Sequence, residues 1–429
     1  MTVTFGVVKR IKGAYGTNSV SLIALSRIMA TGLTLLTAPI IARSIGPIGR
    51  GETATALASF ALIPIIISLG MPLEVRRAVA ESDGSLVVRS ARDICIVSFA
   101  PAAIISAALA FSVFSSMPTS VLLTAALGVF LAPLTVSWLC DQSALIARRN
   151  FRAVAAIQIA QPACYVSLIS FGWVFDCVSV VYVLACNIIG TLVSFALGMW
   201  FCRVSLRGSR CSRLVFVKTS MRYYGSSLAE VASNRFDQLL VLPLIGAFGA
   251  GLYSIAVTVS SIPLSLGHAL GAHFFNVGSR SDNSQLRRLS GFALRAGLLS
   301  AGIFSVFLCA LVPFLVPMVF GSEFSASVPA TLISLLGSVL MTSSYVGSMV
   351  LASQGKGSLM TLSQVLSLVA GLVGLYLLAP GLGAVGASVA SAVGYLVLFA
   401  AVAIALRVRL RDLVPSLTDL RSVVAVLRW

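Results

Sequence analysis

The sequence predicts an all-α polytopic membrane protein with about twelve transmembrane helices in two pseudo-symmetric six-helix lobes. Of its 429 residues, 58% are hydrophobic and only 10% are charged, whereas soluble domains carry about a quarter charged residues. The apolar residues form runs of about 20, the length that crosses ~30 Å of hydrocarbon as a helix. A transmembrane β-barrel would instead show alternating segments of ~10 residues. The division into two lobes comes from an internal repeat.

A glycine motif occurs twice, at a constant shift of 200 residues. Each copy follows an apolar run that holds an arginine, Arg27 in the first and Arg235 in the second. The three matched pairs are Gly46 with Gly246, Gly49 with Gly249, and Gly51 with Gly251. Later pairs, such as Gly190 with Gly394, match at a shift of 204. We therefore predict an N-terminal lobe at 1–201, a basic linker at 202–222 and a C-terminal lobe at 223–429.

The expected spans follow the apolar runs between loops. We place them at 19–45, 53–72, 94–114, 119–140, 153–175, 178–201, 223–246, 250–275, 291–320, 329–351, 359–379 and 383–406. Six spans per lobe is an even number, so the two copies share one orientation. Such parallel repeats occur in transporters that rock two halves about a site near the bilayer midplane.

Basic residues alternate between the predicted loops. Counting the N-terminal segment, 26 of the 30 Lys and Arg residues lie on one side of the predicted membrane. By the positive-inside rule, both termini are expected in the cytoplasm. The net charge of +17 is explained by these loops, so no nucleic-acid partner is expected; membrane lipid is an expected partner of the protein.

Four arginines predict a cationic cavity for an anionic substrate. Arg27 and Arg235 lie inside apolar runs, and Arg43 and Arg50 lie near the predicted outer mouth. Ionisable residues within spans usually face a polar interior, and guanidinium holds phosphate through two parallel hydrogen bonds. The alternatives are structural ion pairs for Arg27 and Arg235, and interfacial anchoring for Arg43 and Arg50.

Other polar residues within spans are candidates for ion coupling or cavity lining. Asp237 and Glu230 are the coupling-ion candidates, because burial raises a carboxyl pKa toward working pH; salt bridges to basic neighbours are the alternative. Asp237 and Arg235 are two positions apart and are expected on different helix faces. The cavity-lining candidates are Asn234, Gln161, Gln364 and Asn187, for which interhelical hydrogen bonding is the alternative. Asp141 is expected to be solvated beside Arg148.

The sequence offers no sign of an enzyme or of a cofactor. It lacks a phosphate-binding loop of the G-x-x-x-x-G-K-[ST] type and an H-E-x-x-H zinc motif. The eight cysteines form no C-x-x-C pair, and His268 and His273, the only histidines, are five residues apart. We therefore predict no catalytic residue, no metal and no cofactor.

Three segments together indicate a known family: RIMATGLTLLTAPIIARSIGPIGRGETATALASF, SNRFDQLLVLPLIGAFGAGLYSIAVTVSSIPLSL and VLASQGKGSLMTLSQVLSLVAGLVGLYLLAPGLGAVGASVASAVGYLV. They resemble bacterial polysaccharide-biosynthesis flippases of the multidrug/oligosaccharidyl-lipid/polysaccharide exporter superfamily. The resemblance implies a V-shaped pair of lobes that flips a polyprenyl-diphosphate-linked oligosaccharide across the bacterial cytoplasmic membrane by alternating access. It also implies that Arg27 and Arg235 match the cavity arginines of lipid II flippases.

The resemblance leaves the substrate partly open. Relatives that carry lipid II often have two further spans, so an exopolysaccharide, capsule or O-antigen-type repeat unit is favoured, with polysaccharide polymerase or export machinery as a partner. Two other functions stay open: a cation-coupled multidrug antiporter of the same superfamily, and a membrane-embedded glycan polymerase or acyltransferase.

Overall fold

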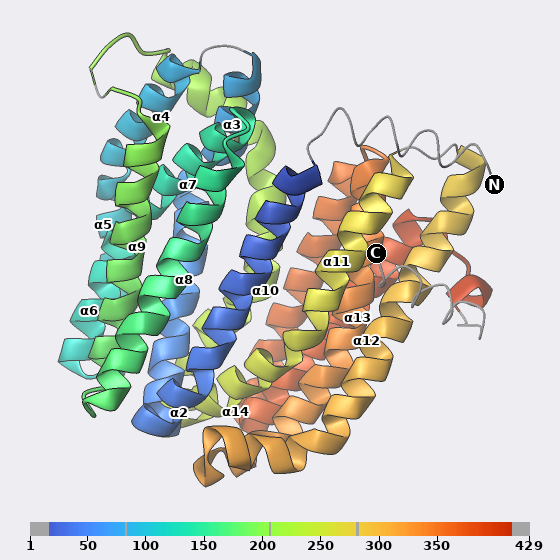
Figure 1. The fold of residues 1–429 in the computed structure, drawn as a ribbon. Coiled ribbons are helices and arrows are strands. Elements are labelled where there is room, and N and C mark those ends of the chain that lie inside the picture. Colours follow the sequence, from blue (N-terminus) through green and yellow to red (C-terminus); the bar gives the residue numbers. More distant parts are fainter. Residues whose placement is uncertain (1–16, 82–83, 206, 280–282, 414–429) are drawn as a thin grey trace. The chain divides into compact units, whose positions relative to one another are not determined.

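The computed structural model describes residues 17–413 apart from 82–83, 206 and 280–282 (Figure 1). Some side chains within helices, including those of Arg27, Glu230 and Asn234, lie outside the description. The described residues contain helices and no strand. The α-helices are α2 (Thr17–Ser68), α3 (Met71–Glu81), α4 (Ser85–Val97), α5 (Phe99–Phe111), α6 (Thr119–Phe130), α7 (Ala132–Ala147), α8 (Phe151–Val174), α9 (Val180–Cys202), α10 (Arg213–Ser260), α11 (Ile262–Gly278), α12 (Asn283–Phe320), α13 (Val328–Ser353) and α14 (Gly357–Ala405). Two short 3₁₀ helices are η1 (Ser322–Ser327) and η2 (Leu410–Leu413).

Nine helical segments of the described chain are long and apolar enough to cross a membrane. Three of them, Met29–Ser68, Arg235–Phe275 and Gly357–Ala405, have 40 residues or more, twice the length that one crossing needs. Each of these three contains a glycine with non-helical backbone, at Gly46, Gly246 or Gly383. The predicted fold class, an all-α polytopic membrane protein, is confirmed.

The repeated glycine motif has the same backbone geometry in both copies. Gly46 has φ 64° and ψ −176°, and Gly246 has φ 74° and ψ 172°. Side chains with a Cβ rarely adopt such positive φ, so glycine is the residue that bends the chain here. The sequence predicted short loops at 46–52 and 247–249; the structure instead shows single-residue breaks, after which helix resumes at once.

The two glycine motifs contact one another. A Cβ added to Gly51 would lie 2.0 Å from the Ala247 carbonyl oxygen, and one added to Gly251 would lie 1.9 Å from the Pro47 carbonyl oxygen. Positions 47 and 51 correspond to 247 and 251 under the 200-residue shift. The contact is therefore reciprocal, as in a two-fold symmetric interface, and it requires two residues without side chains.

The described chain separates into two compact units. Unit 1 comprises Met1–Ile40, Ile63–Ala108 and Leu123–Tyr224; unit 2 comprises Ile41–Leu62, Leu109–Leu122 and Gly225–Trp429. In unit 1, α7 packs against α3, α4 and α9, and Val75, Val88 and Val136 lie in its core. In unit 2, α13 packs against α11, α12 and α14, with Leu294 and Val346 in the core. The sequence-derived lobes at 1–201 and 223–429 stay a prediction.

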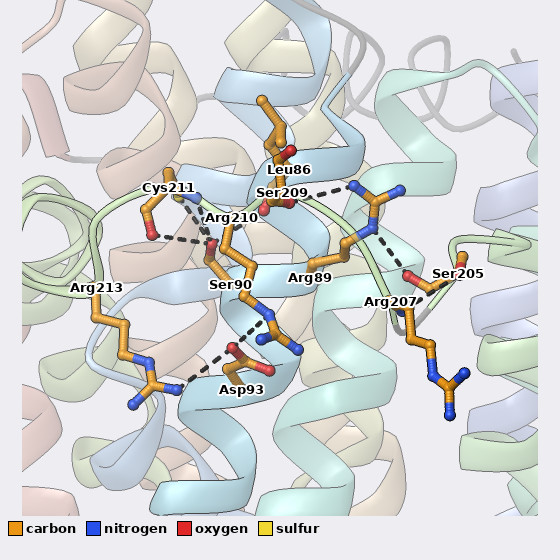
Figure 2. Close-up of polar contacts among 10 residues, drawn as sticks. All are labelled: Leu86, Arg89, Ser90, Asp93, Ser205, Arg207, Ser209, Arg210, Cys211 and Arg213. Carbon is orange, nitrogen blue, oxygen red and sulfur yellow. Dashed lines mark hydrogen bonds and ion pairs between the residues drawn. The ribbon is translucent and has the colours of Figure 1, made fainter.

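The predicted basic linker is fastened to α4 within unit 1 (Figure 2). Arg89 donates from Nε to the Ser205 carbonyl at 2.9 Å and from Nη1 to the Ser209 carbonyl at 3.2 Å. The Ser90 hydroxyl accepts from the Cys211 amide at 3.0 Å. Asp93 pairs with Arg210 at 2.7 Å and Arg213 at 3.5 Å. Only one acidic residue of α4 therefore takes part, and most of the contacts hold the linker backbone.

Asp141 is buried, contrary to the prediction of a solvated residue beside Arg148. Its Oδ1 lies 2.8 Å from Nη2 of Arg92, and the two side chains are 0% and 6% exposed. Arg92 also donates to the Val204 carbonyl at 2.8 Å, and Arg148 donates to the Cys202 carbonyl at 2.9 Å. The sequence suggested the nearest cation along the chain, whereas tertiary packing supplies one from α4.

Candidate functional site: a carboxylate and its pocket in unit 2

Asp237 is the centre of a polar cluster formed by α10 and α14. Its Oδ2 accepts a close hydrogen bond from the Tyr253 hydroxyl and another, 3.3 Å long, from the Ser391 hydroxyl. The Tyr253 and Ser391 oxygens are themselves 2.7 Å apart. The other carboxylate oxygen accepts from the Gln238 amide at 2.8 Å. Three oxygen-bearing side chains from distant positions thus converge on one point.

The break at Gly246 explains how α10 contributes twice to this cluster. Asp237 lies before the break and Tyr253 after it, so one helix supplies both the carboxylate and its phenol partner. Tyr253 is 1% exposed, and a buried phenol usually finds a hydrogen-bond partner. Ser391 comes from the part of α14 that follows Gly383. The break at Gly246 therefore allows two distant residues of α10 to meet at one site.

A small pocket of about 30 Å³ adjoins Asp237, enough room for a water molecule or a small cation. Small residues of α14 make this room. Ser367 donates to the Gly394 carbonyl at 2.7 Å, and a Cβ on Gly394 would meet the Gly371 Cα at 3.3 Å. The polar lining is Asp237, Ser367, Ser391 and Tyr395, and the rest is Ala232, Leu368, Gly371, Leu372 and Gly394.

The predicted arginines lie in different surroundings. Arg235 is exposed, and its Nη1 donates to the Gln238 side chain at 3.3 Å. No ion pair joins it to Asp237 among the described side chains. The side chain of Arg27 lies outside the described residues; the preceding Ser26 is buried and donates to Gln158 of α8 at 2.8 Å.

Arg43 and Arg50 make contacts within unit 2. Arg43 donates from Nε to the Val319 carbonyl at 3.0 Å and from Nη2 to the Met318 carbonyl, so it caps the C-terminal carbonyls of α12. Arg50 is buried and donates to the Thr258 hydroxyl at 3.3 Å. These contacts are structural; a role in substrate binding stays a prediction for both residues.

The remaining candidates are placed only in part. Gln161 of α8 donates to Thr191 of α9 at 3.2 Å, an interhelical hydrogen bond. Gln364 is buried within α14, and Asn187 is half-buried in α9. The side chains of Glu230 and Asn234 lie outside the described residues. Roles in ion coupling or cavity lining stay predictions for all of them.

Three polar residues of unit 2 were not predicted from the sequence. Tyr253 and Ser391 complete the Asp237 cluster, and nothing in the order of residues connects them with it. Glu52 is 6% exposed on α2, without an ion-pair partner among the described side chains. It was overlooked because a loop was predicted at 46–52, where an acidic residue is ordinary. The apolar residues on both sides of it were the signal that could have indicated a helix there.

The described residues show no group of three or more His, Cys, Asp or Glu side chains arranged to hold a metal ion. His268 packs edge-on against Tyr345, with ring centroids 4.6 Å apart. Outside the apolar spans, Arg77 of α3 hydrogen-bonds to Glu74, which raises the pKa of its guanidinium. The Asp237 cluster is therefore the clearest polar site within an apolar region.

Comparison with protein families gives one match that decides the family. Residues 17–271, more than half of the chain, match the family of polysaccharide biosynthesis proteins. The chain belongs to this family. Among curated proteins, none matches the chain. Two of the three segments that first indicated a polysaccharide-biosynthesis protein, at 27–60 and 233–266, lie within the matched range, and the third, at 350–397, lies beyond it.

Solved structures of membrane transporters share the fold of this chain. A structure described as lipid II flippase MurJ in an inward closed conformation has a TM-score of 0.74 and 9% identity, covering 94% of this chain and 92% of that one. An inward-facing multidrug resistance MATE family transporter of the MOP superfamily has a TM-score of 0.62 and 14% identity, covering 94% and 99%. An outward-facing MATE transporter has a TM-score of 0.59 and 13% identity, covering 95% and 94%.

Proposed function

We propose that this protein flips a polyprenyl-diphosphate-linked oligosaccharide across the bacterial cytoplasmic membrane by alternating access. Membership of the polysaccharide biosynthesis family is the observation that carries the proposal. The flippase-type fold, which spans nearly the whole chain, supports transport rather than polymerisation or acyl transfer. An exopolysaccharide, capsule or O-antigen-type repeat unit is the proposed glycan. Polysaccharide polymerase or export machinery is the proposed partner.

In this proposal, Arg27 and Arg235 hold the diphosphate. Both arginines are in helices rich in apolar residues, where a cation is costly unless it meets an anion or a polar interior. The exposed side chain of Arg235 retains free donors beyond its bond to Gln238, and a guanidinium has five N–H groups. Arg43 and Arg50 are assigned a secondary role, since carbonyl and hydroxyl oxygens already engage them.

We further propose that Asp237 binds the coupling cation, a sodium ion or a proton. Carboxylate, hydroxyl and phenol oxygens meet beside a pocket of about 30 Å³, and hard cations take oxygen ligands. Asp237→Asn is expected to abolish coupled transport, whereas Tyr253→Phe keeps the carboxylate and weakens coupling. Transport into vesicles under sodium or proton gradients measures both variants. Equal transport by Asp237→Asn and the wild type would exclude Asp237 from coupling.

The second candidate function is cation-coupled export of small drugs. Structures of MATE transporters share the fold, and a carboxylate in an apolar region, Asp237, would suit a cationic drug. The two functions differ in the residues they require. Loss of Arg27 or Arg235 impairs the flipping of an anionic glycolipid, but leaves cationic drug export intact or improved.

The decisive experiment locates the lipid-linked glycan in cells without this protein. We expect a complete repeat unit to accumulate on the cytoplasmic leaflet, where an externally added glycan-binding probe cannot reach it. Arg27→Ala and Arg235→Ala should reproduce this accumulation although the proteins insert at normal levels. An incomplete repeat unit would instead indicate an enzyme of synthesis, and unchanged lipids would favour drug export.

Both termini are proposed to be cytoplasmic, because 26 of 30 basic residues fall on that side. In a background with the native cysteines replaced, a cysteine at Phe248 should react with an impermeant reagent outside the cell. One at Ser209 should react only after the membrane is opened. The reverse pattern would invert the orientation.

A further inference from the structure

The first three turns of α10 expose a face that combines three large apolar side chains with two basic ones. Leu214, Val215 and Met221 are 80%, 60% and 53% exposed, and Lys218 and Arg222 are exposed beside them. At 100° per residue, these five side chains lie within an arc of about 120°. We call these five residues the α10 basic face.

The opposite side of the same turns is fixed to unit 1. Phe216 is buried in the core that contains Val75, Val88 and Val136. A Cβ on Gly70 would lie 2.4 Å from the Ser220 carbonyl oxygen, so the two backbones touch. The linker before α10 is held by Arg89, as described above. The exposed face is therefore presented in a defined orientation.

The charge of this region has one sign. No acidic residue occurs between Asp176 and Glu230, and residues 203–222 hold six basic residues. Asp93 of α4 pairs with Arg210 and Arg213 of this set. Lys218 and Arg222 have no ion-pair partner among the described side chains. The face therefore favours an anionic partner.

The position of the face along α10 indicates a membrane-surface partner. Within unit 1, ten residues lie between the end of the apolar span Val180–Cys202 and the start of α10 at Arg213, and the linker that they form is held by α4. The start of α10 thus follows the end of a helix long enough to cross the membrane, which puts Lys218 and Arg222 within reach of the headgroups. Aliphatic side chains beside cations suit this layer, because they contact acyl chains while the charges reach phosphate.

We propose that the α10 basic face binds anionic phospholipid, with Lys218 and Arg222 contacting the headgroup phosphate and Leu214 and Met221 contacting its acyl chains. This lipid is a resident of the leaflet, distinct from any flipped substrate, and the proposal does not depend on what the protein transports. Its effect is to anchor the start of α10, and with it unit 1, at the membrane surface.

The test titrates the full-length protein in uncharged detergent with phosphatidylglycerol or phosphatidylcholine, and counts bound lipids by native mass spectrometry. Cations near an anionic surface each strengthen binding about fivefold. Lys218→Gln and Arg222→Gln should therefore each weaken phosphatidylglycerol binding about fivefold, and leave phosphatidylcholine binding unchanged. Leu214→Gln/Met221→Gln should weaken binding of both lipids.

The matched control is Arg152→Gln/Arg409→Gln, which removes two exposed cations on other elements. An equal loss of phosphatidylglycerol binding in this control would overturn the assignment to α10. Equal affinity of the wild type for both lipids would overturn the charge argument. Competition by millimolar inorganic phosphate with no response to the Leu214/Met221 variant would make this a free-anion site and overturn the lipid proposal.

Discussion

Breaking the ion pair between Arg92 and Asp141 should be among the most damaging single changes in unit 1. The two charged atoms are 2.8 Å apart, and the side chains are 6% and 0% exposed. Asp141→Asn keeps the shape of the side chain but removes its charge. The guanidinium then stays buried without a counter-ion, because its other hydrogen bond within the described residues goes to the neutral Val204 carbonyl. Loss of one partner of a buried pair costs about 3–5 kcal/mol.

The buried cysteines of the same core provide the assay. Cys95, Cys140 and Cys202 share the cluster that surrounds this pair, and a thiol-reactive fluorophore reports their exposure during titration with a denaturing detergent. Exposed Cys177 reacts at once and sets the baseline. The free energy of unfolding should fall by about 3–5 kcal/mol in Asp141→Asn. Arg92→Met/Asp141→Asn, which removes both charges, should recover part of this loss.

A matched control is Glu81→Gln, which breaks the pair between Arg77 and Glu81. Here the side chains are 44% and 62% exposed, and exposed pairs of this kind often contribute nothing measurable. Equal stability of Asp141→Asn and this control would refute a large contribution from the buried pair. Additive effects of Arg92→Met and Asp141→Asn in the double variant would refute it as well, since a coupled pair must depart from additivity.

Two further predictions follow from close contacts. Ser90→Cys should form a disulfide with native Cys211, whose Sγ lies 3.0 Å from the Ser90 oxygen. This bond should leave flipping intact. Loss of flipping that is restored by reductant would show that the linker must leave α4 during transport. Gly51→Ala and Gly251→Ala should each lower accumulation of folded protein several-fold, because the new Cβ would meet a carbonyl oxygen at 2.0 or 1.9 Å. Gly32→Ala is the control, because a Cβ there would have nothing within 4 Å. Equal accumulation of all three variants would contradict the close approach.

The sequence predicted the long apolar helices well, because a helix that crosses the hydrocarbon core needs about 20 mostly apolar residues in a row. It also located the breaks at Gly46 and Gly246, since only a repeated glycine motif stood out there. It did not predict that the breaks would be one residue long. A loop and a single glycine with positive φ leave the same local signature, and the difference depends on the packing of the flanking helices.

Polar partners were much harder to predict. Asp237 was singled out from its place in an apolar run, but its partners Tyr253 and Ser391 are joined to it across the break in α10 and from α14. Helical periodicity applies only within an unbroken helix, so it cannot relate residues on either side of Gly246. The prediction for Asp141 was wrong for a similar reason, because its cationic partner, Arg92, lies 49 residues away in the sequence.

The reciprocal glycine contact connects the repeat in the sequence with the fold. A motif that is present twice can pack against its own copy, and then each position is used in two related environments. Gly51 meets Ala247 while Gly251 meets Pro47, so a requirement for a residue without a side chain at one position imposes the same requirement 200 residues later. Gly251 therefore cannot compensate for the loss of Gly51, since each glycine avoids a different clash. A repeated motif that serves only as a helix break would need Gly46 and Gly246 alone; the presence of Gly51 and Gly251 is explained by the contact between the two copies.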